Sequence, residues 1–169
     1  MSEEKIKSLA PLLGVLTFVV VSTAITSLVG SFTGLMQTGK VFMAIFFLTF
    51  GFFKAYNLEG FKEAFKSYDI MAERSDLYAT FYPFLELGLG LLYFLLLSNG
   101  SFELEVFTHV SAMFLMTVGG AGVLNAIREG RNLQCACLGN VFNVPMTKVT
   151  LAEDLGMALM AGYMLLSIL

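Results

Sequence analysis

The chain opens with an uncharged stretch that is long and apolar enough to cross a membrane. Between Ser8 and Gly39 there is no Asp, Glu, Lys or Arg, and Leu9–Val29 consists mostly of apolar residues. A helix needs about 20 consecutive apolar residues to span the hydrocarbon core of a bilayer. We therefore expect Leu9–Val29 to be a transmembrane helix. No clear signal-peptide cleavage site follows it, so we expect it to be retained as an anchor.

The composition extends this expectation to the whole chain. Of the 169 residues, 57% are hydrophobic and 14% are charged, whereas a soluble domain carries roughly 25% charged residues. Four further segments are apolar enough to span a bilayer, namely 39–58, 77–98, 104–127 and 151–169. The alternating pattern of membrane strands does not occur. We predict an all-α membrane protein, a four-helix transmembrane bundle (38–169) plus one additional N-terminal transmembrane helix (within 1–37).

Two shorter patterns indicate local helix structure. Between the second and third spans, apolar residues recur at spacings of three and four, at Leu58, Phe61, Phe65, Tyr68 and Ala72. This pattern predicts an amphipathic helix lying on the membrane surface, with a solvated connecting helix as the alternative. Before the last span, Thr150 and Glu153 have the spacing of a capping box. We expect that helix to begin at this cap.

Charged residues inside the predicted spans need a partner or a role. Lys40 and Lys54 flank the most apolar part of the second span, and we expect their ammonium groups to reach the two membrane interfaces. Glu86 lies well inside the third span, where an unpaired carboxylate is costly. Lys54 and Asn125 are its candidate partners from other spans. Glu86 either supports chemistry, as a proton relay or an aid to redox reactions, or holds helices together.

The distribution of basic residues predicts the orientation in the membrane. Basic residues favour the cytoplasmic side. With a cytoplasmic N-terminus, that side receives nine of the ten basic residues, Lys5, Lys7, Lys54, Lys62, Lys66, Arg74, Arg128, Arg131 and Lys148. Only Lys40 falls outside. We expect a multi-pass protein of the bacterial inner (cell) membrane, with the loop before the last span in the cytoplasm. A reducing cytosol would keep the cysteines of that loop as thiols at rest.

Both cysteines of the chain lie in that loop, one residue apart. Cys135 and Cys137 occur in the stretch NLQCACLGNVFNVP, which covers 132–145. Their sulfurs can converge only if the backbone turns between them, and Gly139 and Asn140 can supply turn conformations. Nearby cations lower the pKa of a thiol, and the thiolate is the reactive form. Three basic residues flank the loop: Arg128, Arg131 and Lys148.

Three interpretations of the cysteine pair remain open. In thiol–disulfide exchange, one cysteine attacks and its neighbour resolves, and a disulfide in so short a ring would be strained and easily reduced. As a soft-metal site, two thiolates suit Cu(I) or a similar ion. Zinc would need four ligands, and His109 is expected near the opposite membrane face. In the third interpretation, the cysteines are small buried residues without chemistry.

Three stretches resemble the MauE/DoxX-like redox-associated membrane proteins. They are FFLTFGFFKAYNLEGF, YPFLELGLGLLY and CACLGNVFNVPMTKVTLAEDLGMALMA, which begin at Phe46, Tyr82 and Cys135. The resemblance covers roughly 39–169 and implies a four-helix membrane bundle used in thiol redox work. It implies that Cys135 and Cys137 are the redox pair and that Glu86 is the buried carboxylate. MauE is associated with maturation of methylamine dehydrogenase, whose small subunit is rich in disulfides.

The function expected from these observations is that of a membrane thiol redox protein acting on a partner protein. A quinone or a thiol-containing partner would exchange electrons with Cys135 and Cys137, with Glu86 in support. The first alternative is handling of Cu(I) or Hg(II) by the same thiols with a metal-carrying partner, since similar chains occur beside heavy-metal-binding domains. The second is a structural membrane subunit. The net charge of −3 and the lack of a basic tract give no sign of nucleic-acid binding.

Overall fold

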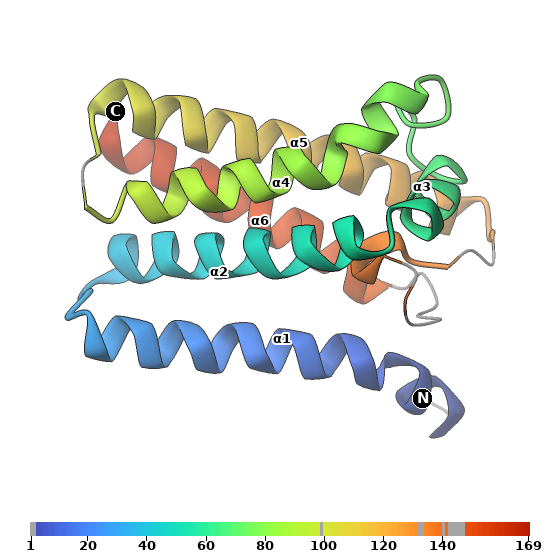
Figure 1. Cartoon of the computed structure of the whole chain (residues 1–169), viewed down its shortest axis with the longest axis horizontal. Helices are drawn as coiled ribbons and strands as arrows, with labels where there is room; N and C mark the ends of the chain where they lie inside the picture. Colours follow the sequence, from blue (N-terminus) through green and yellow to red (C-terminus); the bar gives the residue numbers. More distant parts are fainter. Residues whose placement is uncertain (1–2, 99, 132–133, 140, 142–147) are drawn as a thin grey trace.

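The computed structural model describes residues 3–98, 100–131, 134–139, 141 and 148–169. Within these residues the protein is all-α, as predicted (Figure 1). The elements in chain order are α1 (Glu3–Val29), α2 (Leu35–Tyr56), α3 (Leu58–Lys66), α4 (Asp76–Leu95), α5 (Phe102–Arg128), the short 3-10 helix η1 (Ala136–Leu138) and α6 (Lys148–Ile168).

Five of these helices are long and apolar enough to cross a membrane, which confirms the predicted spans. They are Leu9–Val29 within α1, and α2, α4, α5 and α6 in full. Helix α2 begins at Leu35, before the lysine at position 40, so it has the length that its uncharged middle section alone lacks. Large apolar side chains face outwards along the spans, among them Phe18, Leu159 and Leu166. In a bilayer these outward faces meet lipid.

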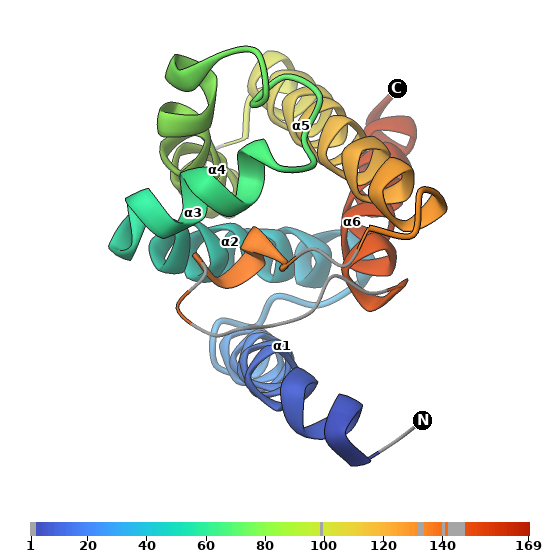
Figure 2. The ribbon, with the colours of Figure 1, turned by 90° about the vertical axis from the view of Figure 1, so that its right-hand side faces the viewer.

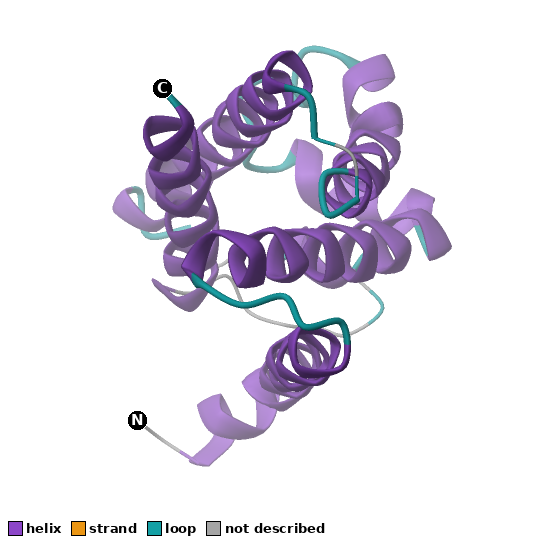
Figure 3. Cartoon of the chain, turned by 90° about the vertical axis from the view of Figure 1, so that its left-hand side faces the viewer, coloured by secondary structure: helices purple, strands orange, loops and turns teal. Residues whose placement is uncertain are grey.

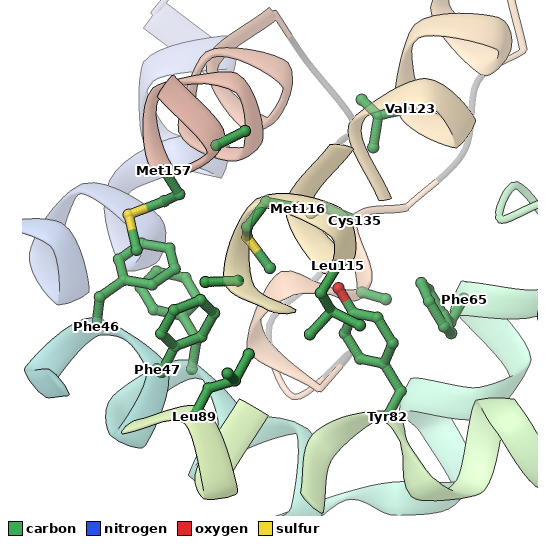
Figure 4. Close-up of a cluster of buried hydrophobic side chains, with 14 of the residues drawn as sticks. Phe46, Phe47, Phe65, Tyr82, Leu89, Leu115, Met116, Val123, Cys135 and Met157 are labelled. Carbon is green, nitrogen blue, oxygen red and sulfur yellow. The ribbon is translucent and has the colours of Figure 1, made fainter. Parts of the chain in front are cut away.

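Helices α2, α4, α5 and α6 surround the core, and α1 lies outside this bundle against α2 (Figure 3). Phe47, Tyr93 and Met164 are at most 1% exposed and come from three of these helices. Figure 4 shows the core continuing through Met157, Met116 and Leu115 to Tyr82 and Cys135. The bundle core and the cysteine turn are therefore parts of one packed interior.

Glycine permits the close contact between α2 and α4. A Cβ atom on Gly90 would lie 2.9 Å from the backbone nitrogen of Leu48, and one on Gly51 would lie 3.2 Å from that of Leu87. Real Cβ atoms rarely come so close to backbone, so these two helices can approach only because both positions lack a side chain. This close packing brings side chains near the end of α2 against the middle of α4.

Helix α3 crosses one end of the bundle (Figure 2). Its apolar residues Phe61 and Phe65 are 0% and 2% exposed, and they pack on protein, including the ring of Tyr82 at 5.9 and 4.5 Å. The expectation of a helix with its apolar face in the membrane surface is therefore wrong. The sequence pattern correctly identified the buried face, but the end of the bundle covers it.

The N-terminus, α3 and η1 lie at the same end of the molecule, and the C-terminus lies at the other end (Figure 1). This arrangement follows from five spans that run antiparallel in succession. It places the cysteine turn at the end that also carries α3.

Candidate functional site

A tight turn brings the two cysteines together. Cys135 precedes η1, and its sulfur accepts a hydrogen bond from the backbone N–H of Cys137 at 3.2 Å. An interaction with the Cys137 side chain also lowers the pKa of Cys135. Gly139 ends the turn with φ of 62°, and its N–H bonds to the carbonyl oxygen of Ala136 at 3.0 Å. The prediction that Gly139 supplies a turn conformation is confirmed. Asn140 and Pro145 lie outside the described residues.

Gly139 also fixes the turn against α2. A Cβ atom at this position would lie 2.2 Å from the carbonyl oxygen of Phe53 and 3.1 Å from the Cα atom of Lys54. No side chain fits there, so glycine is needed for the close approach as well as for its left-handed conformation. The two sulfurs are thereby held beside the last turns of α2.

A small cavity lies where the cysteine turn meets the bundle. Its volume is about 30 Å³, which is room for one or two water molecules. Both cysteines contribute to its wall, and the rest of the lining comes from Lys54, Phe61, Phe65, Tyr68, Tyr82, Gly119, Thr150 and Asp154. Residues from α2, α3, α4, α5 and α6 thus meet the cysteine turn at one point.

Lys54 and Glu86 form a buried ion pair at this cavity. The Nζ atom of Lys54 lies 2.5 Å from Oε1 of Glu86, and the two residues are 8% and 1% exposed. The Lys54 ammonium also lies 5.8 Å and 5.0 Å from the ring centroids of Phe61 and Tyr82. Of the two candidate partners of Glu86, Lys54 is the correct one and Asn125 is exposed. The expectation that Lys54 reaches the interface is wrong, because its partner lies inside the bundle.

The surroundings shift the pKa values of the two cysteines in opposite directions. Burial raises the pKa of Cys135, but hydrogen bonds from Cys137 and Thr150 and the charge of Lys54 outweigh burial, and the pKa is lowered overall. The hydrogen bond to Cys135 raises the pKa of the Cys137 thiol, and burial adds to this effect. In the reduced protein Cys135 is therefore the preferred thiolate and Cys137 the thiol that donates to it.

The cation beside the sulfurs differs from the cations named in the sequence prediction. Arg131 donates to the carbonyl oxygen of Ser67 at 3.0 Å and pairs with Glu129 at 2.8 Å, and Arg128 and Lys148 are exposed. Lys54, which is distant in sequence, acts on both cysteines instead. Its role could not be read from the cysteine loop itself.

Helix α6 adds polar groups to the site. It begins at Lys148, so Thr150 lies inside the helix and the predicted cap at Thr150 is wrong. Thr150 lines the cavity, its Oγ1 is buried without a hydrogen-bond partner in the described residues, and it contributes to lowering the pKa of Cys135. Asp154 also lines the cavity, against the glycines of α5: a Cβ atom on Gly120 would lie 3.3 Å from the Asp154 Cβ.

Sequence reasoning missed Asp154, although a signal was present. Glu153 and Asp154 are adjacent acidic residues inside a predicted span, and the cost of charges in lipid marks such residues as it marks Glu86. Glu153 Oε1 is buried without a hydrogen-bond partner among the described residues. The site therefore contains one buried carboxyl group, from Glu86, and two half-buried ones, from Glu153 and Asp154, where one was predicted.

A second polar cluster lies toward the other end of the bundle. Lys40 of α2 pairs with Glu105 of α5, and Tyr93 Oη lies 3.0 Å from Nδ1 of His109. Lys40 is 4% exposed, so the expectation that it reaches an interface is wrong. His109 precedes the end of α5 by roughly 28 Å of helix, which keeps it away from the cysteines, as predicted.

The described residues contain no cluster of three or more His, Cys, Asp or Glu side chains arranged to hold a metal ion. The converging sulfurs of Cys135 and Cys137 are the soft ligands at the site. Together with the cavity, they leave two kinds of chemistry to consider: exchange of a disulfide, and two-coordinate binding of a soft ion.

Comparison with known proteins identifies the family. The family described as methylamine utilisation protein MauE matches residues 13–167, which is nearly the whole chain. Searches of curated proteins and of solved structures gave no match. The match includes the cysteine turn, the Lys54–Glu86 pair and most of α1. The chain therefore belongs to the MauE family of methylamine utilisation proteins.

Proposed function

We propose that the protein is a membrane-bound thiol–disulfide exchange protein that acts through Cys135 and Cys137 during maturation of a partner protein. The observation that carries this proposal is the tight turn in which the backbone N–H of Cys137 donates to the Cys135 sulfur at 3.2 Å, together with the lowered pKa of Cys135. Membership of the MauE family suggests an accessory membrane protein of methylamine utilisation. Disulfide exchange with a partner protein is the chemistry of this site that fits such a role.

The unequal exposure of the two sulfurs gives them different tasks. Cys135 is 1% exposed, whereas Cys137 is half-buried at the end of the bundle. A sulfur of another protein can reach Cys137 first. Cys137 is therefore the exchange-facing sulfur, and Cys135 is the resolving sulfur held behind it.

Starting from a Cys135–Cys137 disulfide, each step balances. A thiolate of the partner attacks Cys137 Sγ, the disulfide breaks, and Cys135 leaves as a thiolate with the bonding electron pair. A second thiolate of the partner protein then attacks the sulfur that the partner itself contributes to this mixed disulfide. Cys137 leaves and takes up a proton. The partner loses two electrons and two protons and gains a disulfide. The cysteine pair gains the two electrons and one proton, and the other proton passes to water.

The leaving group in the first step is well suited to its task. A thiol of low pKa leaves faster in thiol–disulfide exchange. The backbone N–H of Cys137 donates to the Cys135 sulfur, and Thr150 contributes to the lowered pKa of Cys135. The pair returns to the disulfide by the reverse route with a second protein disulfide.

Trapping with oxidised glutathione tests the assigned roles. The Cys135→Ser variant keeps Cys137 but lacks the resolving sulfur, so it should accumulate a glutathione adduct that intact-mass measurement detects and a reductant removes. The matched Cys137→Ser variant keeps the buried sulfur and should form the adduct at least tenfold more slowly. Equal trapping by both variants, or faster trapping by Cys137→Ser, would contradict the roles. Failure of both to react would contradict exchange altogether.

A second candidate function is the handling of a soft metal ion. Two converging sulfurs, one of them a preferred thiolate, match the two-coordinate geometry that Cu(I) and Hg(II) accept. Titration of the reduced protein with Cu(I) should then show one ion bound per chain, and the ion should be lost from the Cys135→Ser/Cys137→Ser double variant. Tight binding without reversible disulfide formation would favour this function. Partner maturation that persists in the double variant would favour a purely structural subunit.

A further inference from the structure

Building on the proposed function, we propose that Lys54 is a positioning residue whose ammonium group, shared between Glu86 and Cys135, sets how strongly the cysteine pair oxidises its partner. The fold brings the three groups together from separate elements: Lys54 from α2, Glu86 from α4 and Cys135 from the turn before α6.

Lys54 is held in place from several sides. Glu86 Oε1 lies 2.5 Å from its Nζ atom, and the rings of Phe61 and Tyr82 lie within 5.8 Å. The residue is 8% exposed and forms part of the cavity wall together with both cysteines. Because the ammonium group is already fixed in this way, little free energy is needed to reorganise it when a negative charge forms on a sulfur.

The cysteine turn has a fixed position relative to this charge. Gly139 approaches the backbone of Phe53 and Lys54 so closely that even a Cβ atom would overlap with it. Cys135 and Lys54 are therefore anchored to the same stretch of α2 backbone. The distance between thiolate and ammonium is a property of the packing rather than of a mobile loop.

The charge of Lys54 distinguishes the two redox states. A disulfide is neutral, whereas the reduced pair carries a negative charge when Cys135 is a thiolate. Attraction between opposite charges is strong where water is scarce, so the ammonium stabilises the reduced form and not the oxidised one. Stabilising the reduced form makes a dithiol pair more oxidising. The lowered pKa of Cys135 agrees with this direction.

Glu86 competes with Cys135 for the same ammonium group. Lys54 is the cation that lines the cavity, and within the described residues the ionisable groups facing the pair are otherwise acids, namely Tyr68, Tyr82, Glu86, Glu153 and Asp154. Removing the charge of Glu86 makes the electrostatic potential at the Cys135 sulfur more positive, because the charge of Lys54 is then no longer offset. Removing the charge of Lys54 does the reverse. Opposite effects of these two substitutions are specific to an electrostatic role.

The test measures the equilibrium between dithiol and disulfide in the purified full chain. Glutathione buffers at pH 8 set the potential, and quenching with a maleimide followed by mass measurement counts free thiols. Lys54→Met should shift the equilibrium toward the disulfide by roughly tenfold, which is about 30 mV for a two-electron couple. Glu86→Gln should shift it toward the dithiol, and Lys54→Arg should restore most of the wild-type value.

Two further variants separate this role from damage to the fold. Lys54→Met/Glu86→Gln removes both charges without leaving an unpaired carboxylate, and it should remain shifted toward the disulfide. Lys40→Met breaks the matching ion pair at the other end of α2 and should leave the equilibrium within twofold of wild type. Shifts in the same direction for Lys54→Met and Glu86→Gln, or shifts below twofold, would overturn the inference. A wild-type pair that does not form a disulfide at all would instead overturn the proposed function.

Discussion

Lys54 Nζ contacts Glu86 Oε1 at 2.5 Å, and the same lysine lines a small cavity together with Cys135 and Cys137. This relationship joins the buried charges of the bundle to the reactive turn at its end. Helix α2 carries a second buried ion pair, between Lys40 and Glu105. The two lysines are about 21 Å apart along the helix, so one pair belongs to the cysteine site and the other does not.

The Gly139→Ala substitution should dislodge the cysteine turn. The new Cβ would lie 2.2 Å from the carbonyl oxygen of Phe53, and the left-handed conformation adds a cost of about 1–3 kcal/mol for a residue other than glycine. We expect lower thermal stability in detergent and faster maleimide labelling of Cys135. Gly130→Ala is the matched control, because Gly130 has φ of +65° but nothing within 4 Å of its added Cβ. Equal effects of both substitutions would contradict the close approach.

Cys135 should ionise at lower pH than an ordinary thiol, which has a pKa of about 8.5. Burial opposes ionisation, but hydrogen bonds and Lys54 outweigh it and lower the pKa. A lowered pKa means that the thiolate, and the reactivity that depends on it, persists as the pH falls below the ordinary value. The pH midpoint of iodoacetamide labelling of Cys137→Ser, which keeps a hydroxyl donor, measures this. A midpoint at or above that of free cysteine would contradict the lowered pKa of Cys135.

Breaking the Lys40–Glu105 pair should cost stability without touching the redox site. Lys40 is 4% exposed, and removing one partner of a buried ion pair costs roughly 3–5 kcal/mol because it leaves the other charge unpaired. Lys40→Met should lower the melting temperature in detergent, and Lys40→Met/Glu105→Gln should recover most of the loss. A double variant no more stable than Lys40→Met would show that loss of the ion pair is not the cause of the lower melting temperature.

The orientation in the membrane is testable from the two ends of the bundle. Glu59 on α3 and Glu103 on α5 are exposed and lie at opposite ends. In a Cys135→Ser/Cys137→Ser background, a membrane-impermeant maleimide should label Glu103→Cys in intact spheroplasts and Glu59→Cys only after lysis. This outcome follows from the excess of basic residues at the α3 end. The reverse labelling pattern would place the cysteine turn on the outer side.

The sequence predicts the helices well because their cause is local. A run of about 20 apolar residues specifies a membrane span regardless of its neighbours, and Leu9–Val29 was predicted with its observed bounds. The cysteine pair can also be identified from the sequence, because two sulfurs one residue apart need only a backbone turn to converge. A carboxylate as costly to bury as that of Glu86 needs a partner. Lys54 is predicted as this partner because few cations occur in the spans.

The remaining features depend on how the helices face one another, which a single sequence does not encode locally. The pairing of Lys40 with Glu105 and of Tyr93 with His109 requires the rotation of each helix about its axis. The burial of Phe61 followed from its spacing, but whether lipid or protein covers it depends on the fold. Asp154 is the exception, because its position inside a predicted span marks it in the sequence alone.

The most direct test of the account is a redox titration of the wild-type protein in glutathione buffers, with free thiols counted by maleimide and mass measurement. We predict that both thiols disappear together, reversibly, along a single two-electron curve, and that Cys135→Ser and Cys137→Ser abolish this transition. Thiols that stay free under oxidising buffer, or that are lost one at a time, would contradict a role of Cys135 and Cys137 as a dithiol–disulfide pair.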